Sequence, residues 1–480
     1  MTDAPNLPMI KPSDAKSWSL CARRVWLDNK GDFDFAPIED EFERLVIALG
    51  LVHEQAILQR LSGVMDVHTA SSPDDTRRLI AQRVPVIYQA HLLSEEEGII
   101  GLPDFLILDE SGEYQAADAK LALSEEKKEI QVQLGIYRRL LGSQLPAIVF
   151  LGDGERALIG DEANTVANQF ITEMRELLSA KEEPLVRYSH SKCRACPYYT
   201  YCKAGFKEKE DLSLLYGIQG RAASGLETVG IGTITQLAST DPSAIPDIPY
   251  LKGLEKKRRA VFQAKSYLTG GVFQLNSVTL PEGHWIHFDI EDNPLTGTGE
   301  KHVYLWGFLV PNYGDDDFEY IWTDHDEEDE QSWLQFLAQI EKYRQRYSNL
   351  ILAHYSSHER TTILTYAQRY DMEDNPTVVY LLGDESPLFD MRRPVLDSLV
   401  LPLQGYGLKD VCKHEDLVNF QWEDEDSGSQ WSVVQFNRFL NESDPQMRET
   451  LKNDILRYNR DDVTATRRLE EWLRQNFAFS

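Results

Sequence analysis

The stretch Trp285-Ile-His-Phe-Asp-Ile-Glu291 has the alternation of a β-strand that carries acidic residues on one face. Because successive strand residues point to opposite faces of a sheet, Asp289 and Glu291 share one face, where they can hold one or two cations. Further along, Tyr458-Asn-Arg-Asp-Asp462 places a tyrosine one helical turn before another carboxylate, so Tyr458 could position a water that attacks a phosphate. The pattern predicts an α/β domain over residues 272–480 with an acidic metal site.

Two other acidic residues are candidates to complete this site. Glu359, in Ala353-His-Tyr-Ser-Ser-His-Glu359, is the natural further ligand, whereas Asp397 could serve instead or could cap a helix. Two metal ions about 4 Å apart would stabilise both the attacking and the leaving oxygens of a phosphodiester. The set formed by Asp289, Glu291, Glu359, Tyr458 and Asp462 resembles the RNase H-like DEDD exonucleases of the type that ends in Tyr-x-x-x-Asp, over about residues 280–476. That family usually has Asp where this chain has Glu359.

A second acidic set lies in the first part of the chain, in Gly101-Leu-Pro-Asp104 and Asp118-Ala-Lys120. Both aspartates come late in adjacent expected strands, so their carboxylates could converge at one edge of a sheet. A hard cation such as Mg²⁺ is usually held by one or two carboxylates together with water and substrate phosphate. Lys120 lies on the same face as Asp118 and could stabilise charge that develops on the phosphate. This geometry favours hydrolysis of a phosphodiester.

Residues of two neighbouring helices point to the same site. His53, which precedes Glu54, offers an imidazole that could complete the coordination of a transition metal such as Mn²⁺, although a single histidine can equally be a core residue. Gln133 and Tyr137 are one turn apart on the helix that follows the Asp-x-Lys strand. In this order, the His-Glu, Gly-x-x-Asp, Asp-x-Lys and Gln-x-x-x-Tyr motifs resemble the RecB-like branch of the PD-(D/E)XK nucleases. The resemblance implies a restriction-endonuclease-like core over residues 1–210.

Four of the five cysteines form a pattern in which Cys21 is followed, far downstream, by Cys193-x-x-Cys196 and Cys202. Four thiolates suit either a structural Zn²⁺ ion or a [4Fe-4S] cluster. One remote cysteine followed by such a C-x2-C-x5-C set resembles the iron-sulfur staple of the Cas-type and AddB-type nucleases. This resemblance favours the [4Fe-4S] cluster over zinc, and it implies a structural cluster that ties both ends of the nuclease fold together.

Residues 211–271 read as a small helical connector. Leu226-Glu-Thr-Val-Gly-Ile-Gly-Thr233 resembles one helix-hairpin-helix element, in which backbone amides at a helix start approach a phosphate. A Gly-x-Gly turn between two packing helices is the plain alternative. The neighbouring basic cluster Lys256-Lys-Arg-Arg259 favours a DNA contact.

Helices and strands alternate on both sides of this connector. The pattern predicts strands at 84–93, 99–108, 114–121 and 146–151, with helices at 41–61, 124–141 and 162–180. After the connector it predicts strands at 285–290, 304–310 and 318–323, followed by helices at about 329–347, 358–370, 433–440 and 446–474. The fold class expected is therefore α/β multidomain.

Composition sets limits on partners and location. The net charge of −29 is unevenly distributed, because residues 211–270 hold 7 basic and 5 acidic side chains whereas residues 271–480 hold 18 and 39. Metal would neutralise part of the acid, so a nucleic-acid partner stays compatible with this charge. No apolar run reaches the ~18 residues of a membrane span, and the first residues carry no signal region, which predicts a cytoplasmic protein without a membrane partner.

Taken together, the motifs resemble those of bacterial RecB-like nucleases with a C-terminal predicted exonuclease domain. The resemblance implies Mg²⁺- or Mn²⁺-dependent cleavage of DNA whose single-stranded ends are threaded toward a site, in repair or in defence against foreign DNA. The sequence holds no Gly-x-x-x-x-Gly-Lys-Ser/Thr phosphate loop, so unwinding would need a helicase or another repair or defence partner. Two alternatives stay open. One is a nuclease with a single working site whose RNase H-like half holds DNA, and the other is a non-catalytic DNA-binding adaptor.

Overall fold

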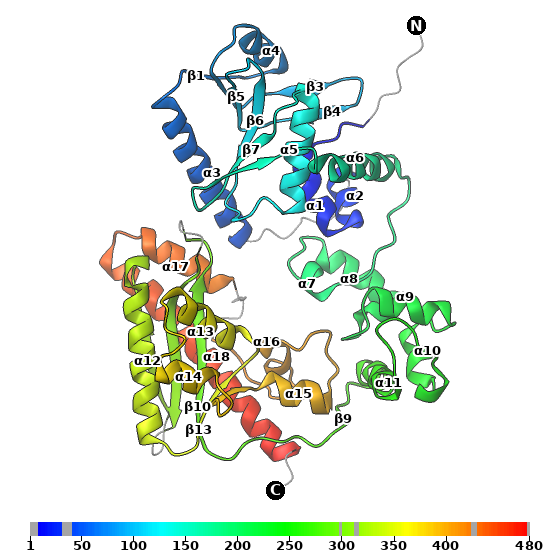
Figure 1. Cartoon of the computed structure of the whole chain (residues 1–480). Coiled ribbons are helices and arrows are strands. Elements are labelled where there is room, and N and C mark those ends of the chain that lie inside the picture. The colour runs from blue at the N-terminus through cyan, green and yellow to red at the C-terminus, as the bar shows by residue number, and fades with distance from the viewer. Residues whose placement is uncertain (1–7, 31–40, 297–299, 312–315, 424–429, 478–480) are drawn as a thin grey trace. The chain divides into compact units, whose positions relative to one another are not determined.

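The computed structural model describes residues 8–30, 41–296, 300–311, 316–423 and 430–477 (Figure 1). The N-terminal residues considered for a signal region lie largely outside these ranges. The chain divides into two compact units: the first comprises Met1–Val186 with Gly297–Glu300, and the second comprises Arg187–Thr296 with Lys301–Ser480. Each unit is described separately.

The first unit is built on a mixed six-stranded sheet with the order β1-β2-β5-β6-β7-β8. β5 and β6 are antiparallel, and β6 and β7 are parallel. β3 and β4 form a separate antiparallel hairpin. The strands are β1 Val67–Thr69, β2 Val86–Tyr88, β3 Leu92–Ser94, β4 Ile99–Gly101, β5 Phe105–Leu108, β6 Tyr114–Ala119, β7 Ala147–Phe150 and β8 Arg156–Ile159.

Helices cover both faces of this sheet. Ile57 and Leu61 of α3 pack on one face against Phe105 and Phe150, whereas Leu134 of α5 belongs to the core on the other face. Buried residues of α5 and α6 form a further core with the first helices of the chain. The helices are α1 Ala15–Leu20, α2 Ala22–Lys30, α3 Glu41–Ser62, α4 Pro73–Ala81, α5 Lys128–Leu141 and α6 Ala163–Ser179.

The structure differs from the sequence prediction where the chain turns inside an apolar run. Residues 84–93, expected as one strand, contain β2 and β3, because Gln89 has a positive φ of 56° and bends the chain between them. Residues 99–108 likewise contain β4 and β5, separated by a segment with Pro103, which has no backbone N–H to donate to a strand ladder. The second break brings Asp104 to the start of β5.

The second unit begins with a helical part. It consists of α7 His190–Cys193, α8 Tyr199–Glu208, α9 Arg221–Thr228, α10 Ile234–Ser239 and α11 Leu254–Thr269. α11 is bonded to the segment near β15, since Arg259 donates to the Leu399 carbonyl at 2.9 Å and Gln263 donates to the Leu401 carbonyl at 2.7 Å. Lys257 pairs with Asp247 at 2.7 Å. Two members of the basic cluster thus have intramolecular partners.

The Gly-Ile-Gly turn between α9 and α10 already has acceptors for its backbone amides. Gln236 Oε1 accepts from the Gly232 amide at 2.7 Å, and Glu210 Oε2 accepts from the Thr235 amide at 3.0 Å. A carboxylate therefore occupies the place at this helix start where a phosphate would bind. This arrangement favours the turn as a packing element between helices.

The rest of the second unit contains a five-stranded sheet with the order β12-β11-β10-β13-β14. β10 pairs antiparallel with β11 and parallel with β13, so it lies at the centre of the sheet. A two-stranded sheet pairs β9 with β15. The strands are β9 Phe273–Gln274, β10 His284–Asn293, β11 His302–Pro311, β12 Asp316–Trp322, β13 Leu350–His354, β14 Leu388–Asp390 and β15 Leu399–Val400.

The alternation along β10 distributes its side chains between two layers. Ile286, Phe288 and Ile290 belong to the core that includes α12, α13 and α14, while Asp289 and Glu291 lie on the face toward α18. β10 and β11 both contact α18. The helices are α12 Asp329–Arg346, α13 His358–Arg369, α14 Pro376–Leu382, α15 Arg392–Ser398, α16 Leu408–Cys412, α17 Trp431–Asn441 and α18 Pro445–Asn476.

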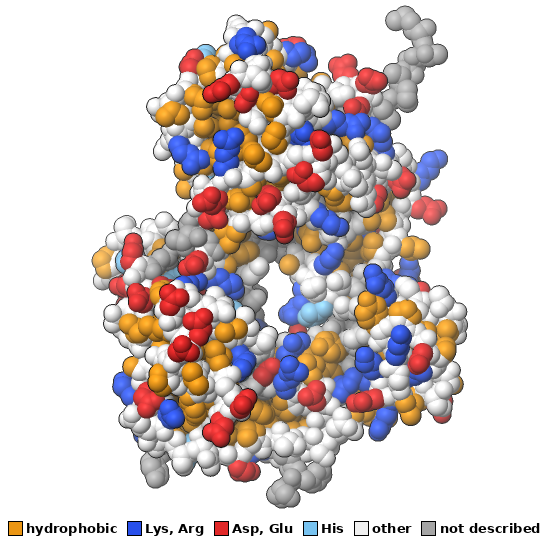
Figure 2. All heavy atoms as spheres, in the orientation of Figure 1, with side chains coloured by type: hydrophobic (Ala, Val, Ile, Leu, Met, Phe, Trp, Pro, Cys, Tyr) orange, Lys and Arg blue, Asp and Glu red, His pale blue; other side chains and the backbone are white. Residues whose placement is uncertain are grey.

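Surface charge is mixed on the face shown in Figure 2, where acidic and basic side chains are interspersed on each unit. Among the described residues, no helix combines the length and the apolar character that crossing a membrane requires.

Candidate active sites

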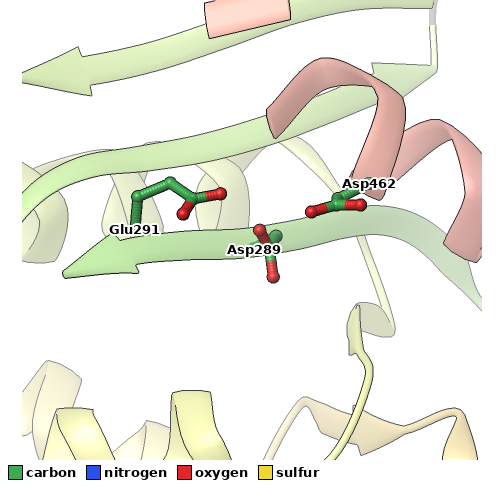
Figure 3. Close-up of side chains that lie close together, drawn as sticks. All are labelled: Asp289, Glu291 and Asp462. Atoms are coloured by element: carbon green, nitrogen blue, oxygen red, sulfur yellow. The ribbon is translucent and has the colours of Figure 1, made fainter. Parts of the chain in front are cut away.

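Three carboxylates gather on the central strand of the second unit (Figure 3). Asp289 and Glu291 come from β10 and Asp462 comes from α18, and each offers one oxygen such that all three lie within 4.8 Å of one another. Among the described residues, this is the one group of three or more possible metal ligands whose ligand atoms all lie within that distance of one another. Oxygen donors at this spacing suit Mg²⁺ or Mn²⁺.

Neutral donors fix the orientation of these carboxylates. Asn459 Nδ2 donates to Asp289 Oδ2 at 2.8 Å and is 3.4 Å from Glu291 Oε1. Ser432 Oγ donates to Glu291 Oε2 at 2.6 Å, and Trp422 Nε1 donates to Asp462 Oδ1 at 2.7 Å. Each carboxylate thus keeps one or more lone pairs for a cation, while a hydrogen bond from a neutral side chain fixes its rotamer. This is expected for a preorganised metal site.

Burial and mutual repulsion raise the proton affinity of all three carboxylates. Burial raises the pKa of Glu291 to about 8, and the charge of Asp462 is the second largest cause of this shift. Burial also raises the pKa of Asp462 to about 6, against the opposing effect of the Lys409 ammonium. The pKa of Asp289 is raised well above its usual range by burial and then by Asp462, Glu291 and Glu359. Such a group favours either bound protons or a bound cation.

These shifts predict how metal stabilisation changes with pH. The folded pKa of Glu291 is about 8 and its ordinary value is 4.5, so the unfolded chain binds fewer protons between these values and the metal-free fold loses stability as pH rises through them. A divalent cation replaces those protons. We expect Mn²⁺ to raise the Tm more at pH 8 than at pH 6, measured by thermal unfolding of metal-free protein with and without the ion.

Burial also raises the pKa of Asp104, so the first unit could contribute to this pH dependence. The same measurement on Asp289→Asn distinguishes the contribution of the second unit from that of the first. The pH dependence of the Mn²⁺ effect should shrink in this variant. An equal Tm gain at both pH values in the unmodified protein would contradict the prediction.

Tyr458 and Lys409 lie against the acidic group. Tyr458 is buried on α18 one turn before Asp462, and its hydroxyl is 3.1 Å from Lys409 Nζ. Lys409 Nζ also lies 4.3 Å from the centre of the Tyr458 ring. Burial lowers the pKa of Lys409, although Asp462, Glu291 and Asp289 oppose this shift. The Lys409 ammonium therefore holds the Tyr458 hydroxyl beside the carboxylates.

The other two acidic candidates have different surroundings. Glu359, in the first turn of α13, is buried and its Oε2 is 3.0 Å from Nδ1 of the buried His354. Glu359 lies outside the group of three carboxylates but is close enough to contribute to the raised pKa of Asp289. The side chain of Asp397 is exposed, and its backbone carbonyl accepts from Arg259 and Asn276. Its position offers no contact with the three carboxylates.

In the first unit the structure brings Asp104 and Asp118 together. The Asp104 amide donates to Asp118 Oδ1 at 3.0 Å, and the Ala119 amide donates to Asp104 Oδ2 at 2.8 Å. Lys120 Nζ is 2.9 Å from Asp118 Oδ2. Burial, followed by the charge of Asp118, raises the pKa of Asp104 well above its usual range. Burial alone would lower the pKa of Lys120, but Asp118 and Asp104 raise it, so the ammonium stays charged.

The helices supply further groups to this site. Glu54 is buried, accepts from Tyr88 at 2.8 Å and from Gln89 at 2.6 Å, and contributes to the raised pKa of Asp104. His53 Nε2 lies 3.1 Å from the Phe150 carbonyl oxygen. A neutral imidazole that donates through Nε2 to a carbonyl keeps Nδ1 as an acceptor, the usual state of a metal-binding histidine.

Tyr137 and Gln133 lie on α5 as expected. The Tyr137 hydroxyl donates to the Leu102 carbonyl at 3.3 Å, and a Cβ on Gly101 would come within 2.8 Å of the Tyr137 ring. Burial, with Asp118 and Asp104, raises the pKa of Tyr137 well above its usual range, so the phenol stays protonated. Gln133 is partly buried four residues before it. Tyr137 thus supports the turn that carries Asp104.

The cysteines of the sequence pattern are placed as follows. Cys21 separates α1 from α2 in the first unit, while Cys193 ends α7 and Cys202 lies in α8 of the second unit. The Cys196 amide donates to the Cys193 carbonyl at 3.0 Å, and Cys193 Sγ accepts from the Ser189 amide at 3.3 Å. The fifth, Cys412, is fully buried in the core of the second unit.

Sequence reasoning missed several residues that support these sites. Asn459 stands directly beside a recognised motif, since it follows Tyr458, whereas Lys409 lies in Tyr406-Gly-Leu-Lys409, outside the motifs considered. Ser432 and Trp422 have no sequence signal, because only folding brings them to Glu291 and Asp462. Glu54 was noted only as the neighbour of His53, because the histidine was the candidate metal ligand of that pair.

Comparison with known proteins supports the C-terminal assignment. Residues 286–474 match the family model RNase_H_2 of the RNase H superfamily. A comparison with curated proteins gives no match. Among solved structures, "Crystal structure of SSO0001" is similar at a TM-score of 0.25 and 15% identity, over 42% of this chain and 89% of that chain, which is too weak to carry an argument. The family model identifies residues 286–474 as an RNase H superfamily domain that contains Asp289, Glu291 and Asp462.

Proposed function

We propose that this protein is a metal-dependent nuclease that hydrolyses DNA phosphodiester bonds, acting as an exonuclease on single-stranded ends, with one active site in each unit. The observation that carries the proposal is the group formed by Asp289, Glu291 and Asp462 inside an RNase H superfamily domain. Three carboxylates with raised pKa values have no structural advantage over apolar residues unless a cation binds them.

In the RNase H-like domain, Asp289, Glu291 and Asp462 would hold Mg²⁺ or Mn²⁺, with Glu359 as a further ligand through its longer side chain. When bound, the cation would neutralise the carboxylates and stabilise charge on the attacking and leaving oxygens. Asn459 and Trp422 keep two of the carboxylates in place. The Tyr458 hydroxyl, held by Lys409, would orient the attacking water.

In the first unit, a PD-(D/E)XK-type site would use Asp104, Asp118 and His53 as metal ligands. The Lys120 ammonium, 2.9 Å from Asp118, would stabilise charge that develops on the phosphate. Glu54 would join this site as an additional carboxylate, and Gln133 and Tyr137 would line it from α5. The support for this half is the contact between Asp104 and Asp118, which a nuclease of this type requires.

From the sequence pattern we further propose that Cys21, Cys193, Cys196 and Cys202 ligate a [4Fe-4S] cluster, with Zn²⁺ as the other metal that thiolates favour. Its role would be structural. Free DNA ends would come from a helicase or another repair or defence protein, since the chain has no phosphate loop of its own.

The test is degradation of DNA by protein purified under anaerobic conditions, with iron and sulfide measured in the same sample. The substrates are 5′- and 3′-labelled single strands, a circular single strand, a duplex and an RNA of the same sequence, each with Mg²⁺, with Mn²⁺ or with EDTA. We expect progressive, metal-dependent shortening of the linear single strand and an intact circle. Cleavage of none of the substrates with either metal would overturn the proposal and favour a DNA-binding adaptor.

A further inference from the structure

Lys409 is a half-buried cation placed against an acidic site. Its Nζ lies 3.1 Å from the Tyr458 hydroxyl, 4.3 Å from the centre of the Tyr458 ring and 5.4 Å from the centre of the Trp422 ring. Trp422 in turn donates to Asp462 at 2.7 Å. One ammonium therefore lies against two aromatic residues that border the carboxylates.

The short helix α16 holds Lys409 in this position. Val411 and Cys412, on the same helix, are fully buried, and α16 packs against α18, which carries Tyr458 and Asp462. Asp410 Oδ2 accepts from the Gly407 amide at 3.1 Å and from Arg194 at 3.2 Å. These contacts fix the backbone from which the Lys409 side chain extends toward Tyr458.

We propose that Lys409 is a positioning residue of the RNase H-like site, which holds the Tyr458 hydroxyl toward the reacting phosphate and weakens cation binding to the three carboxylates. The proposal rests on the proposed function for its catalytic part only. Its electrostatic part depends on the charges alone, because a fixed positive charge near a site repels a divalent ion.

The two parts predict effects of opposite direction. Loss of the ammonium should tighten Mn²⁺ binding, because one repulsive charge disappears. The same loss should lower kcat by about 10- to 100-fold, as for other residues that orient a metal site, because the Tyr458 hydroxyl then keeps only its contact with Asp462 among these two partners. A residue that only stabilises the fold would weaken metal binding and catalysis together.

The experiment compares Lys409→Met, Lys409→Arg and the control Lys413→Met with the unmodified protein. Lys413 is one turn further along and lies 5.5 Å from the centre of the Trp422 ring, whereas it is Lys409 Nζ that contacts the Tyr458 hydroxyl. Asp118→Asn is present in all four proteins, so that the first unit contributes no cleavage. Mn²⁺ affinity is measured by titration calorimetry, and kcat and KM are measured on a labelled single strand.

We expect Lys409→Met to bind Mn²⁺ severalfold more tightly with a lower kcat and an unchanged KM, Lys409→Arg to restore kcat, and Lys413→Met to keep kcat. Adding Tyr458→Phe should remove most of the effect of Lys409→Met on kcat, since the hydroxyl is then absent. Weaker or unchanged Mn²⁺ affinity in Lys409→Met would overturn the proposal. Should the unmodified protein cleave nothing, the affinity measurement still decides the electrostatic part, while the proposed function fails separately.

Discussion

Asp289→Asn and Asp118→Asn are each expected to abolish one of two nuclease activities and to leave the other. Asparagine has nearly the shape of aspartate but no charge, so each variant loses a ligand for the cation while the fold is preserved. The affected activity should fall by at least about 100-fold, the scale of removing one group that stabilises a transition state. The measurement is the rate of degradation of labelled DNA by each single variant and by the double variant, which should be inactive.

Asp397→Asn is the matched control, because this aspartate is exposed and its backbone carbonyl, not its carboxylate, makes the contacts described above. It should retain full activity, which would also remove Asp397 as an alternative ligand. If Asp289→Asn cleaved every substrate as fast as the unmodified protein, the RNase H-like domain would be a DNA-holding platform and the protein a nuclease with a single site.

Gly307→Ala is expected to damage the C-terminal site more than any other addition of one methyl group in that domain. Gly307 on β11 is paired with Asp289 on β10, and a Cβ at this position would overlap Asn459 Oδ1. Asn459 would have to move, and it is the donor to Asp289 and Glu291. We expect a loss of about 1–3 kcal/mol in the free energy of unfolding, as for overpacking. Mn²⁺ affinity of the domain, measured by calorimetry in Asp118→Asn protein, should fall with it.

Gly205→Ala serves as the control, since this glycine lies inside α8 with nothing within 4 Å of an added Cβ. It should leave stability unchanged or raise it by about 0.5–1 kcal/mol through helix propensity. The double variant Gly307→Ala with Asn459→Ala should regain much of the stability, because the overlap is gone, but not the metal affinity, because the donor is gone too. Normal Mn²⁺ binding by Gly307→Ala would show that Asn459 does not order the carboxylates.

The sequence was most informative where the spacing of residues has a direct geometric meaning. Alternation in Asp289-Ile-Glu291 requires a shared strand face, and the RNase H superfamily match over residues 286–474 confirms the C-terminal fold assignment. Helices such as α12 and α18 were predicted close to their observed bounds, because their apolar residues recur with a strong helical period. The RecB-like fold of the first part and the [4Fe-4S] cluster stay predictions.

Elements without a distinctive period were missed. β13, which pairs with β10 in the centre of the sheet, is a run of five buried residues, and such a short apolar run does not distinguish a strand from a buried helix segment. The division of residues 84–93 into two strands depends on the backbone of Gln89, a residue type that carries no turn signal. In each case the tertiary environment outweighs the local preference.

By itself, the sequence determined which residues could act as ligands: two carboxylates two positions apart on a strand, a tyrosine and an aspartate one turn apart on a helix, and an Asp-x-Lys pair. These relations are local, so the geometry of a strand or a helix is sufficient to establish them. Only the tertiary structure decided which groups surround those ligands. Lys409, Trp422 and Ser432 reach the acidic site from separate helices and loops, and their contacts depend on how the chain packs over long distances in sequence.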